Sequence, residues 1–295
     1  MSLRSLLRST DRGAGEIHIG GELVGERVLV PLVADEATQI VDQIKVGVAI
    51  ATASNGSVRI EEPQTTDDRR YRTISPAAEP EATANLVQWG LDRMAPDQGR
   101  VEGILAARSI ERRVREHVRH DEVDTLVLPR TSGDGPLGFR RLRRLANRSN
   151  CNVVWINGKS GYREFASILL PIAEGPHSGL ATDVAGAIAE TVDAYVDILH
   201  VIPPDPDDET SLAAQERVDT AANRMELGER ATPWVLEADD PVATIVEQSN
   251  YYGLTVVGAP TAGRLKQFVY GSASRSIRSA AENMVIATRT AGEYR

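Results

Sequence analysis

The segment Val28-Leu-Val-Pro-Leu-Val33 occurs a second time, in altered form, as Ile168-Leu-Leu-Pro-Ile-Ala173. Each is an apolar strand pattern with proline in the fourth place. Three further pairs of segments follow in the same order, offset by about 130–140 residues: 48–52 with 187–191, 125–128 with 254–257, and 152–155 with 283–286. Four matched segments in one order indicate an internal repeat, so we predict that the chain holds two copies of one domain.

Within each copy, apolar strand patterns alternate with helical ones. One helical face repeats every four residues in Leu180, Val184, Ile188 and Val192. Asp240-Pro241 predicts the N-cap and first turn of a later helix. Helices that alternate with strands apolar throughout are typical of a parallel sheet covered on both faces. We therefore predict the α/β class, with two tandem open α/β sandwiches, each a mainly parallel five-stranded sheet with helices on both faces.

The repeat also sets the expected boundaries. Residues 1–25 lie outside it and are predicted to form an N-terminal arm. The first domain is expected at 26–158, a linker at 159–164 and the second domain at 165–295. The acidic run 205–209 is predicted to be a solvated loop.

Composition limits the classes of function. The 295 residues include 42 acidic and 33 basic side chains, a net charge of −9, which argues against nucleic acid and anionic membranes as partners. No apolar run approaches the roughly 18 residues of a membrane span, so we expect a cytoplasmic protein without membrane insertion. Lysine occurs only at 45, 159 and 266, and an acidic chain rich in arginine is typical of salt-loving microbes.

No catalytic or metal-binding constellation is visible in the sequence. The five histidines lack metal-ligand spacing, and His117 and His120 are expected to face solvent from a charged helix. The serines of 272–279 lack the context of a nucleophile. Cys151 precedes an apolar strand and is interpreted as a core residue.

Three short segments match known motifs, but their positions or residues do not fit those motifs well. His18-Ile-Gly-Gly21 precedes the first strand of its domain, whereas a nucleotidyl-transfer signature follows one. Gly158-Lys159-Ser160 lacks the first glycine of a phosphate-binding loop, because Val153 stands there. Gly133–Gly138 fits G-x-G-x-x-G but follows the fourth strand of its copy. This segment has three possible interpretations: a dinucleotide fingerprint, an anion-binding turn or a plain turn. We favour the plain turn.

The second copy carries a stronger signal after its fourth strand. Gly258 ends that strand, Ala259 and Gly263 follow, and Gly271-Ser272 precede a helix expected at 274–281. Ligands of open α/β sheets bind at the carboxyl ends of parallel strands. Free N–H groups and the dipole at a helix N-terminus favour phosphate. The segment therefore suits a nucleotide.

This segment resembles the universal stress protein family, whose ATP-binding members share Gly-x2-Gly-x9-Gly-(Ser/Thr). Gly258, Gly271 and Ser272 match the first, third and fourth elements, whereas Thr261 stands at the second. The resemblance covers 165–289 well and 26–158 loosely. It implies a fold like that of adenine nucleotide alpha hydrolases.

The resemblance also implies a ligand, ATP or another adenine nucleotide. The residues expected to bind it are Pro171, Ala173, Gly258, Ala259, Gly263, Gly271, Ser272 and Ser274. The Asp that ATP-binding members carry after the first strand is missing from 171–174. In the first copy Pro129 replaces the strand-end glycine and no Gly-Ser pair follows, so that site is predicted to be degenerate. The first copy carries a group of arginines that we interpret as a solvated face, with contact to phosphate or to the other domain as the alternative. These are Arg140, Arg141, Arg143, Arg144 and Arg148.

The leading hypothesis is a tandem universal stress protein, a nucleotide-responsive stress or regulatory module. The sequence shows no candidate general base or metal ligand for slow ATP hydrolysis. We therefore predict that the protein is not an enzyme. The alternative is a ligand-free dimerisation or interaction protein, including one that regulates a membrane transporter; its protein partner is unknown. Family members pair through their last strands, here 152–156 and 285–288. A homodimer through these strands is one outcome, and pairing of the two within one chain is the other.

Overall fold

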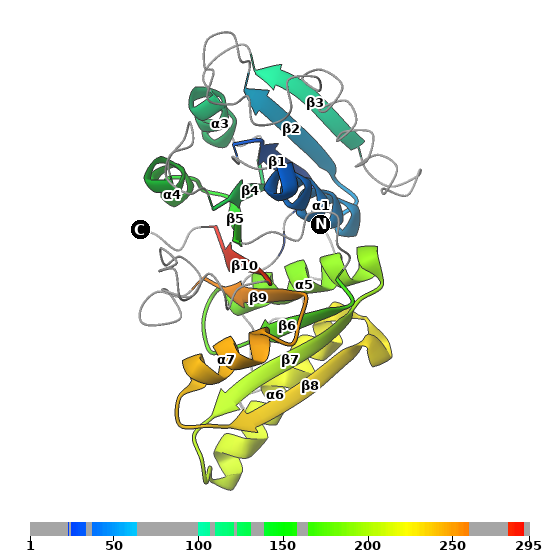
Figure 1. Ribbon diagram of the computed structural model, residues 1–295, viewed down its shortest axis with the longest axis vertical. Coiled ribbons are helices and arrows are strands. Elements are labelled where there is room, and N and C mark those ends of the chain that lie inside the picture. Colours follow the sequence, from blue (N-terminus) through cyan, green and yellow to red (C-terminus); the bar gives the residue numbers. More distant parts are fainter. Residues whose placement is uncertain are drawn as a thin grey trace, which may run out of the picture.

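The computed structural model describes residues 23, 25–33, 37–63, 100–106, 110–120, 123–130, 139–157, 165–259 and 283–291. The strands of this part are β1 (Arg27–Pro31), β2 (Ser57–Pro63), β3 (Arg100–Ala106), β4 (Thr125–Pro129), β5 (Asn152–Asn157), β6 (Ser167–Pro171), β7 (Tyr195–Ile202), β8 (Ala231–Glu237), β9 (Leu254–Gly258) and β10 (Met284–Arg289). They form one ten-stranded sheet in the order β3-β2-β1-β4-β5-β10-β9-β6-β7-β8 (Figure 1). The end strand β8 contains a proline, Pro233.

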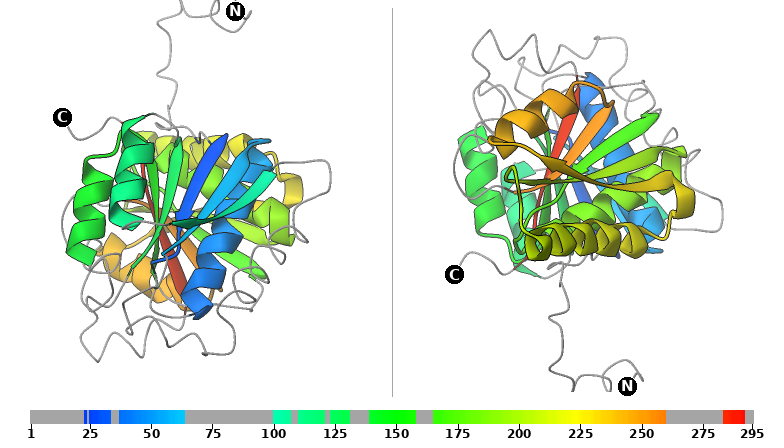
Figure 2. Two further views of the ribbon diagram at one scale, coloured as in Figure 1. Left: turned by 90° about the horizontal axis from the view of Figure 1, so that it is seen from above. Right: turned by 90° about the horizontal axis from the view of Figure 1, so that it is seen from below.

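The helices lie on both faces of this sheet. They are α1 (Ala37–Ala53), α3 (Ile110–Arg119), α4 (Phe139–Asn147), α5 (Ser178–Val192), α6 (Asp208–Met225) and α7 (Pro241–Ser249), with a short 3-10 turn, η3 (Gly228–Arg230). Helices α1, α5 and α6 pack on one face, and α3, α4 and α7 lie on the other (Figure 2). The predicted α/β class is therefore confirmed.

The strand directions divide the sheet into two halves of equal size. Strands β1–β5, the first half, are parallel to one another, and so are β6–β10, the second half. Read outward from the middle, both halves have the same order, because 5-4-1-2-3 corresponds to 10-9-6-7-8. The halves meet where β5 and β10 pair antiparallel, with Ile286 opposite Ile156. We call this pairing the seam.

The seam decides between the two outcomes expected for the last strands. Strand β5 pairs with β4 and β10, and β10 pairs with β9 and β5. Pairing within one chain is thus confirmed. Both edges of β5 and of β10 are occupied by neighbouring strands, so neither can pair with a second molecule. The prediction of a homodimer through these strands is therefore wrong.

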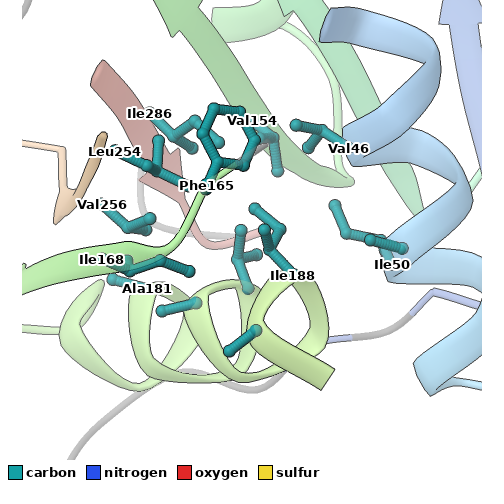
Figure 3. Close-up of a cluster of buried hydrophobic side chains, with 14 of the residues drawn as sticks. Val46, Ile50, Val154, Phe165, Ile168, Ala181, Ile188, Leu254, Val256 and Ile286 are labelled. Carbon is teal, nitrogen blue, oxygen red and sulfur yellow. The ribbon is translucent and has the colours of Figure 1, made fainter. Parts of the chain in front are cut away.

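Apolar packing continues across the seam on the face that carries α1 and α5. Val46 and Ile50 of α1 belong to one buried cluster with Ile188 of α5, Val154 of β5 and Ile286 of β10 (Figure 3). The predicted face of α5 is buried as expected at Leu180, Val184 and Ile188. Removal of such surface from water is the main driving force of folding, so this core stabilises both halves together.

On the other face, Arg289 of β10 reaches into the first half. Its side chain is buried, and Nη2 donates to the carbonyl oxygen of Ala146 at 2.5 Å and to Oγ of Ser149 at 3.2 Å. These acceptors lie at the carboxyl end of α4, where a cation is favoured by the helix dipole. Next to it, the N–H of Ala291 donates to Oδ1 of Asn152 at 3.0 Å.

The acidic run 205–209 is not only a loop, and this part of the prediction is wrong. Asp207 is the N-cap of α6 and accepts from the N–H of Thr210 at 2.8 Å, while Asp208 and Glu209 form the first turn. Carboxylates are stabilised at a helix N-terminus by its unpaired N–H groups, so the helix begins inside the run.

We expect Ile286→Ala to lower the free energy of unfolding by about 2–5 kcal/mol, because Ile286 is fully buried at the seam and truncation leaves a cavity. Leu212→Ala is the control, since Leu212 is 62% exposed on α6 and its truncation should cost under about 0.5 kcal/mol. Urea unfolding followed by circular dichroism measures both. Equal losses in the two variants would contradict a core that crosses the seam.

Candidate functional site

The predicted site lies where the order of the second half reverses direction, between β6 and β9. These strands pair at only two positions, Ile168 with Leu254 and Leu169 with Thr255, whereas β6 and β7 pair over the whole of β6. Their carboxyl ends therefore separate. Ligands of open α/β sheets bind in the crevice at such a switch point.

Four of the predicted site residues lie at this edge. Pro171 ends β6, and the exposed Ala173 follows it; Gly258 ends β9 and is followed by Ala259, both half-buried. Their side chains are small, which suits close approach of a nucleotide. The other predicted residues, Gly263, Gly271, Ser272 and Ser274, lie outside the described residues, as does the expected helix 274–281.

His177, a residue that the sequence did not single out as functional, explains the glycine at 258. A Cβ at 258 would lie 3.1 Å from Cβ of His177 and 3.2 Å from its carbonyl carbon and oxygen. His177 is the buried N-cap residue of α5, and its Nδ1 accepts from the N–H of Thr290 at 3.2 Å. The imidazole thus connects α5 with the chain that follows β10. Gly258 is required here for close approach.

Gly258→Ala should lower the free energy of unfolding by about 1–3 kcal/mol, because the new methyl group presses on the backbone of His177. That backbone is held in place, since its carbonyl oxygen accepts from the N–H of Ala181 at 3.0 Å. Gly253→Ala is the matched control at the other end of β9, where a Cβ meets nothing closer than 3.7 Å. Thermal and urea unfolding compare the two, and an equally stable Gly258→Ala protein would refute the packing argument.

A polar cluster of three residues, Glu174, His200 and Arg217, lies beside the same end of β6. Nδ1 of His200 is 2.8 Å from the carbonyl oxygen of Ile172, and its Nε2 is 3.1 Å from Nη1 of Arg217. The carbonyl can only accept and the guanidinium can only donate, so the ring is neutral with its proton on Nδ1. Nη2 of Arg217 donates to Oε1 of Glu174 at 2.7 Å. The acid nearest the strand end is thus bound to Arg217.

Burial is the main reason that the pKa of His200 lies below its ordinary value, and the charge of Arg217 lowers it further. The unfolded chain, with an ordinary pKa near 6.5, therefore binds this proton more readily than the folded one. We expect the contribution of His200 to stability to be complete above about pH 6.5 and to be lost as the pH falls toward its folded-state pKa.

His200→Asn tests this pH dependence, because the amide keeps a donor for the Ile172 carbonyl but does not titrate. Urea unfolding of both proteins at several pH values between about 5 and 8 should give a shallower acid slope for the variant. Identical slopes would show that His200 does not contribute to acid destabilisation.

The corresponding edge of the first half is closed by Gln43 of α1. Strands β1 and β4 also pair at only two positions. Nε2 of the fully buried Gln43 donates across the gap to the carbonyl oxygens of Pro31 at 3.0 Å and Val127 at 3.3 Å. On α5, Asp183 follows Pro171 by the same number of residues as Gln43 follows Pro31. Its carboxylate instead accepts hydrogen bonds from the N–H of Leu23 and from the side chain of Arg224.

The remaining sequence-predicted features separate into three groups. Cys151 is buried as predicted, and burial raises the pKa of its thiol. Arg143, Arg144 and Arg148 are exposed, in agreement with a solvated face, whereas the side chains of Arg140 and Arg141 are not described. His117 corrects its prediction, because its half-buried ring lies 3.3 Å from Nη1 of Arg59 on β2. The motifs at 18–21, 133–138 and 158–160 lie outside the described residues.

Two kinds of feature are absent from the described residues. Within them, no three or more His, Cys, Asp or Glu side chains gather where a metal ion would fit. In the same part of the chain, no helix has the length and apolar character needed to cross a bilayer.

The second half of the chain is similar to a known protein family. Residues 164–289 match the model of the Universal stress protein family. The match spans all five strands of the second half together with the expected phosphate segment, so the universal stress protein resemblance seen in the sequence is confirmed there. No curated protein matches the chain.

Solved structures extend the likeness to the whole fold. The chain is similar to the cytoplasmic domain of a prokaryotic cation chloride cotransporter, with a TM-score of 0.59 and 14% identity over 90% of this chain and 96% of that one. It is also similar to a universal stress protein from Archaeoglobus fulgidus, with a TM-score of 0.52 and 14% identity over 91% of this chain and 98% of that one. At such identity the likeness establishes the fold alone.

Proposed function

We propose that the chain is a tandem universal stress protein, a cytoplasmic stress or regulatory module that responds to ATP or another adenine nucleotide without catalysing a reaction. The observation that carries the proposal is the coincidence of two features in one half. Residues 164–289 match the family, and the switch point between β6 and β9 ends in the first glycine of the nucleotide motif.

The proposed binding mode uses the carboxyl ends of both β6 and β9. The phosphates would contact Gly263, Gly271, Ser272 and Ser274, whose backbone and hydroxyl donors suit an anion. The rest of the nucleotide would lie along Pro171, Ala173, Gly258 and Ala259. No free carboxylate follows β6 directly, since Glu174 is bound to Arg217.

The first half supports a stoichiometry of at most one nucleotide per chain. Its switch point is bridged by Gln43, and Pro129 takes the place of the strand-end glycine. A ligand there would have to displace an amide that pairs two buried carbonyls, which is costly unless each bond is replaced.

Calorimetric titration with ATP at high salt, combined with native mass spectrometry, should detect one bound nucleotide per chain. Gly271→Asp should abolish binding in a folded protein, because a carboxylate at the N-terminus of the helix expected at 274–281 would compete with phosphate for the same donors. Pro129→Gly is the matched control in the first half and should leave the affinity unchanged. Two equivalent nucleotides, or full affinity in folded Gly271→Asp, would overturn this assignment.

A second candidate function is a ligand-free interaction module that regulates a membrane transporter. The observation in its favour is the similarity to a cotransporter cytoplasmic domain over nearly the full length of both chains. The two candidates differ in the ATP titration, since the interaction module would bind its protein partner equally well with and without nucleotide.

A further inference from the structure

The ion pair between Arg217 and Glu174 is strongly asymmetric in its exposure to water. The Arg217 side chain is only 13% exposed, whereas that of Glu174 is 83% exposed. A guanidinium held under the surface cannot move far, but an exposed carboxylate exchanges readily with water. Ion pairs with one such partner are weak.

The guanidinium of Arg217 is also oriented by a contact with His200. Its Nη1 lies against Nε2 of the neutral His200, whose ring is fixed in turn by the carbonyl oxygen of Ile172. A second contact of Arg217, from Nη2 to Glu174, points to the chain that leaves β6. A guanidinium has five N–H donors in a planar fork, a geometry that binds phosphate in a bidentate manner.

The location connects this cation to the proposed nucleotide site. Glu174 directly follows Ala173, and His200 lies on β7 just beyond Leu199, which is opposite Pro171. The cluster therefore lies at the carboxyl edge of β6 and β7, the edge at which ligands of such sheets bind.

We propose that Arg217 is an anion-binding residue of this edge, that Glu174 occupies it in the free protein, and that a phosphate group of the ligand displaces the Glu174 carboxylate. The proposal rests on the proposed function for the identity of the ligand as a nucleotide. In this arrangement the Glu174 carboxylate competes with the ligand for Arg217 and so lowers the affinity for the ligand. His200 is a positioning residue that holds the Arg217 guanidinium in the orientation that binds the ligand.

The first test measures ATP and adenosine affinities by calorimetry in the full chain. Glu174→Gln should raise the affinity for ATP about two- to fivefold, the range that corresponds to losing an exposed ion pair, and leave that for adenosine unchanged. Glu190→Gln is the matched control, because Glu190 pairs with Arg230 at 3.3 Å near the opposite end of α5 and is 69% exposed. It removes the same charge and should change neither affinity.

A double-mutant cycle separates competition from general repulsion. Arg217→Met should weaken ATP binding, and in its background Glu174→Gln should bring no further gain. A gain that persists without Arg217 would mean that Glu174 only repels anions at a distance, and the proposal would fall. An equal rise for adenosine would overturn it as well, since the loop rather than the anion subsite would then be responsible.

Inorganic phosphate provides an arm that does not depend on nucleotide binding. Phosphate should raise the melting temperature of Glu174→Gln more than that of the original protein at matched ionic strength, and Arg217→Met should abolish the difference. If ATP fails to bind to any variant but this difference is present, the proposed function is wrong and the subsite stands. If ATP binds and neither ATP nor phosphate responds to Glu174, the subsite is wrong and the function stands.

Discussion

The antiparallel pairing of β5 with β10 is the interaction on which the rest of the structure depends. Without it each half would end in an apolar strand with an unpaired edge, which is a site for aggregation. With it, α1 and α5 come together over one face, a single apolar cluster extends across the seam, and Arg289 closes the carboxyl end of α4 from the other half. The two halves thus share buried contacts on both faces of the sheet.

The seam also gives the two halves opposite directions. Because β5 and β10 are antiparallel, the carboxyl ends of β1–β5 lie at one edge of the sheet and those of β6–β10 at the other. The two switch points are therefore on opposite sides of the molecule. They differ in chemistry as well, since an amide bridges the first, whereas small residues end the strands at the second and an ion pair lies beside it. A response to a ligand at the second edge can reach the first half through the seam and through the packing of α1 against α5.

The sequence contained enough information for the fold because the fold depends on local apolar patterns that occur twice. The repeat around Pro31 and Pro171 located the matching strands, and Asp240-Pro241 located the start of α7. The site was predicted only in part. Gly258 was recognised from a motif, but its contact with His177 arises only when β9 and α5 are packed together.

Residues that act across long sequence separations escaped prediction. Gln43 looks like any polar residue of a helix until α1 lies over the gap between two strands. Arg217 and Glu174 are 43 positions apart, and no spacing rule joins them. The error at the acidic run 205–209 had a different cause, because composition alone does not distinguish a solvated loop from a well-capped helix start.

A sheet assembled by joining strands side by side has no intrinsic limit to its width, and Pro233 bears on where this one stops. It lies on β8, the strand at one end of the row of ten. Proline has no N–H to donate, and natural sheets place it on outer strands to discourage an added neighbour. Pro233 therefore makes this border of the sheet a poor template for a further strand from another molecule.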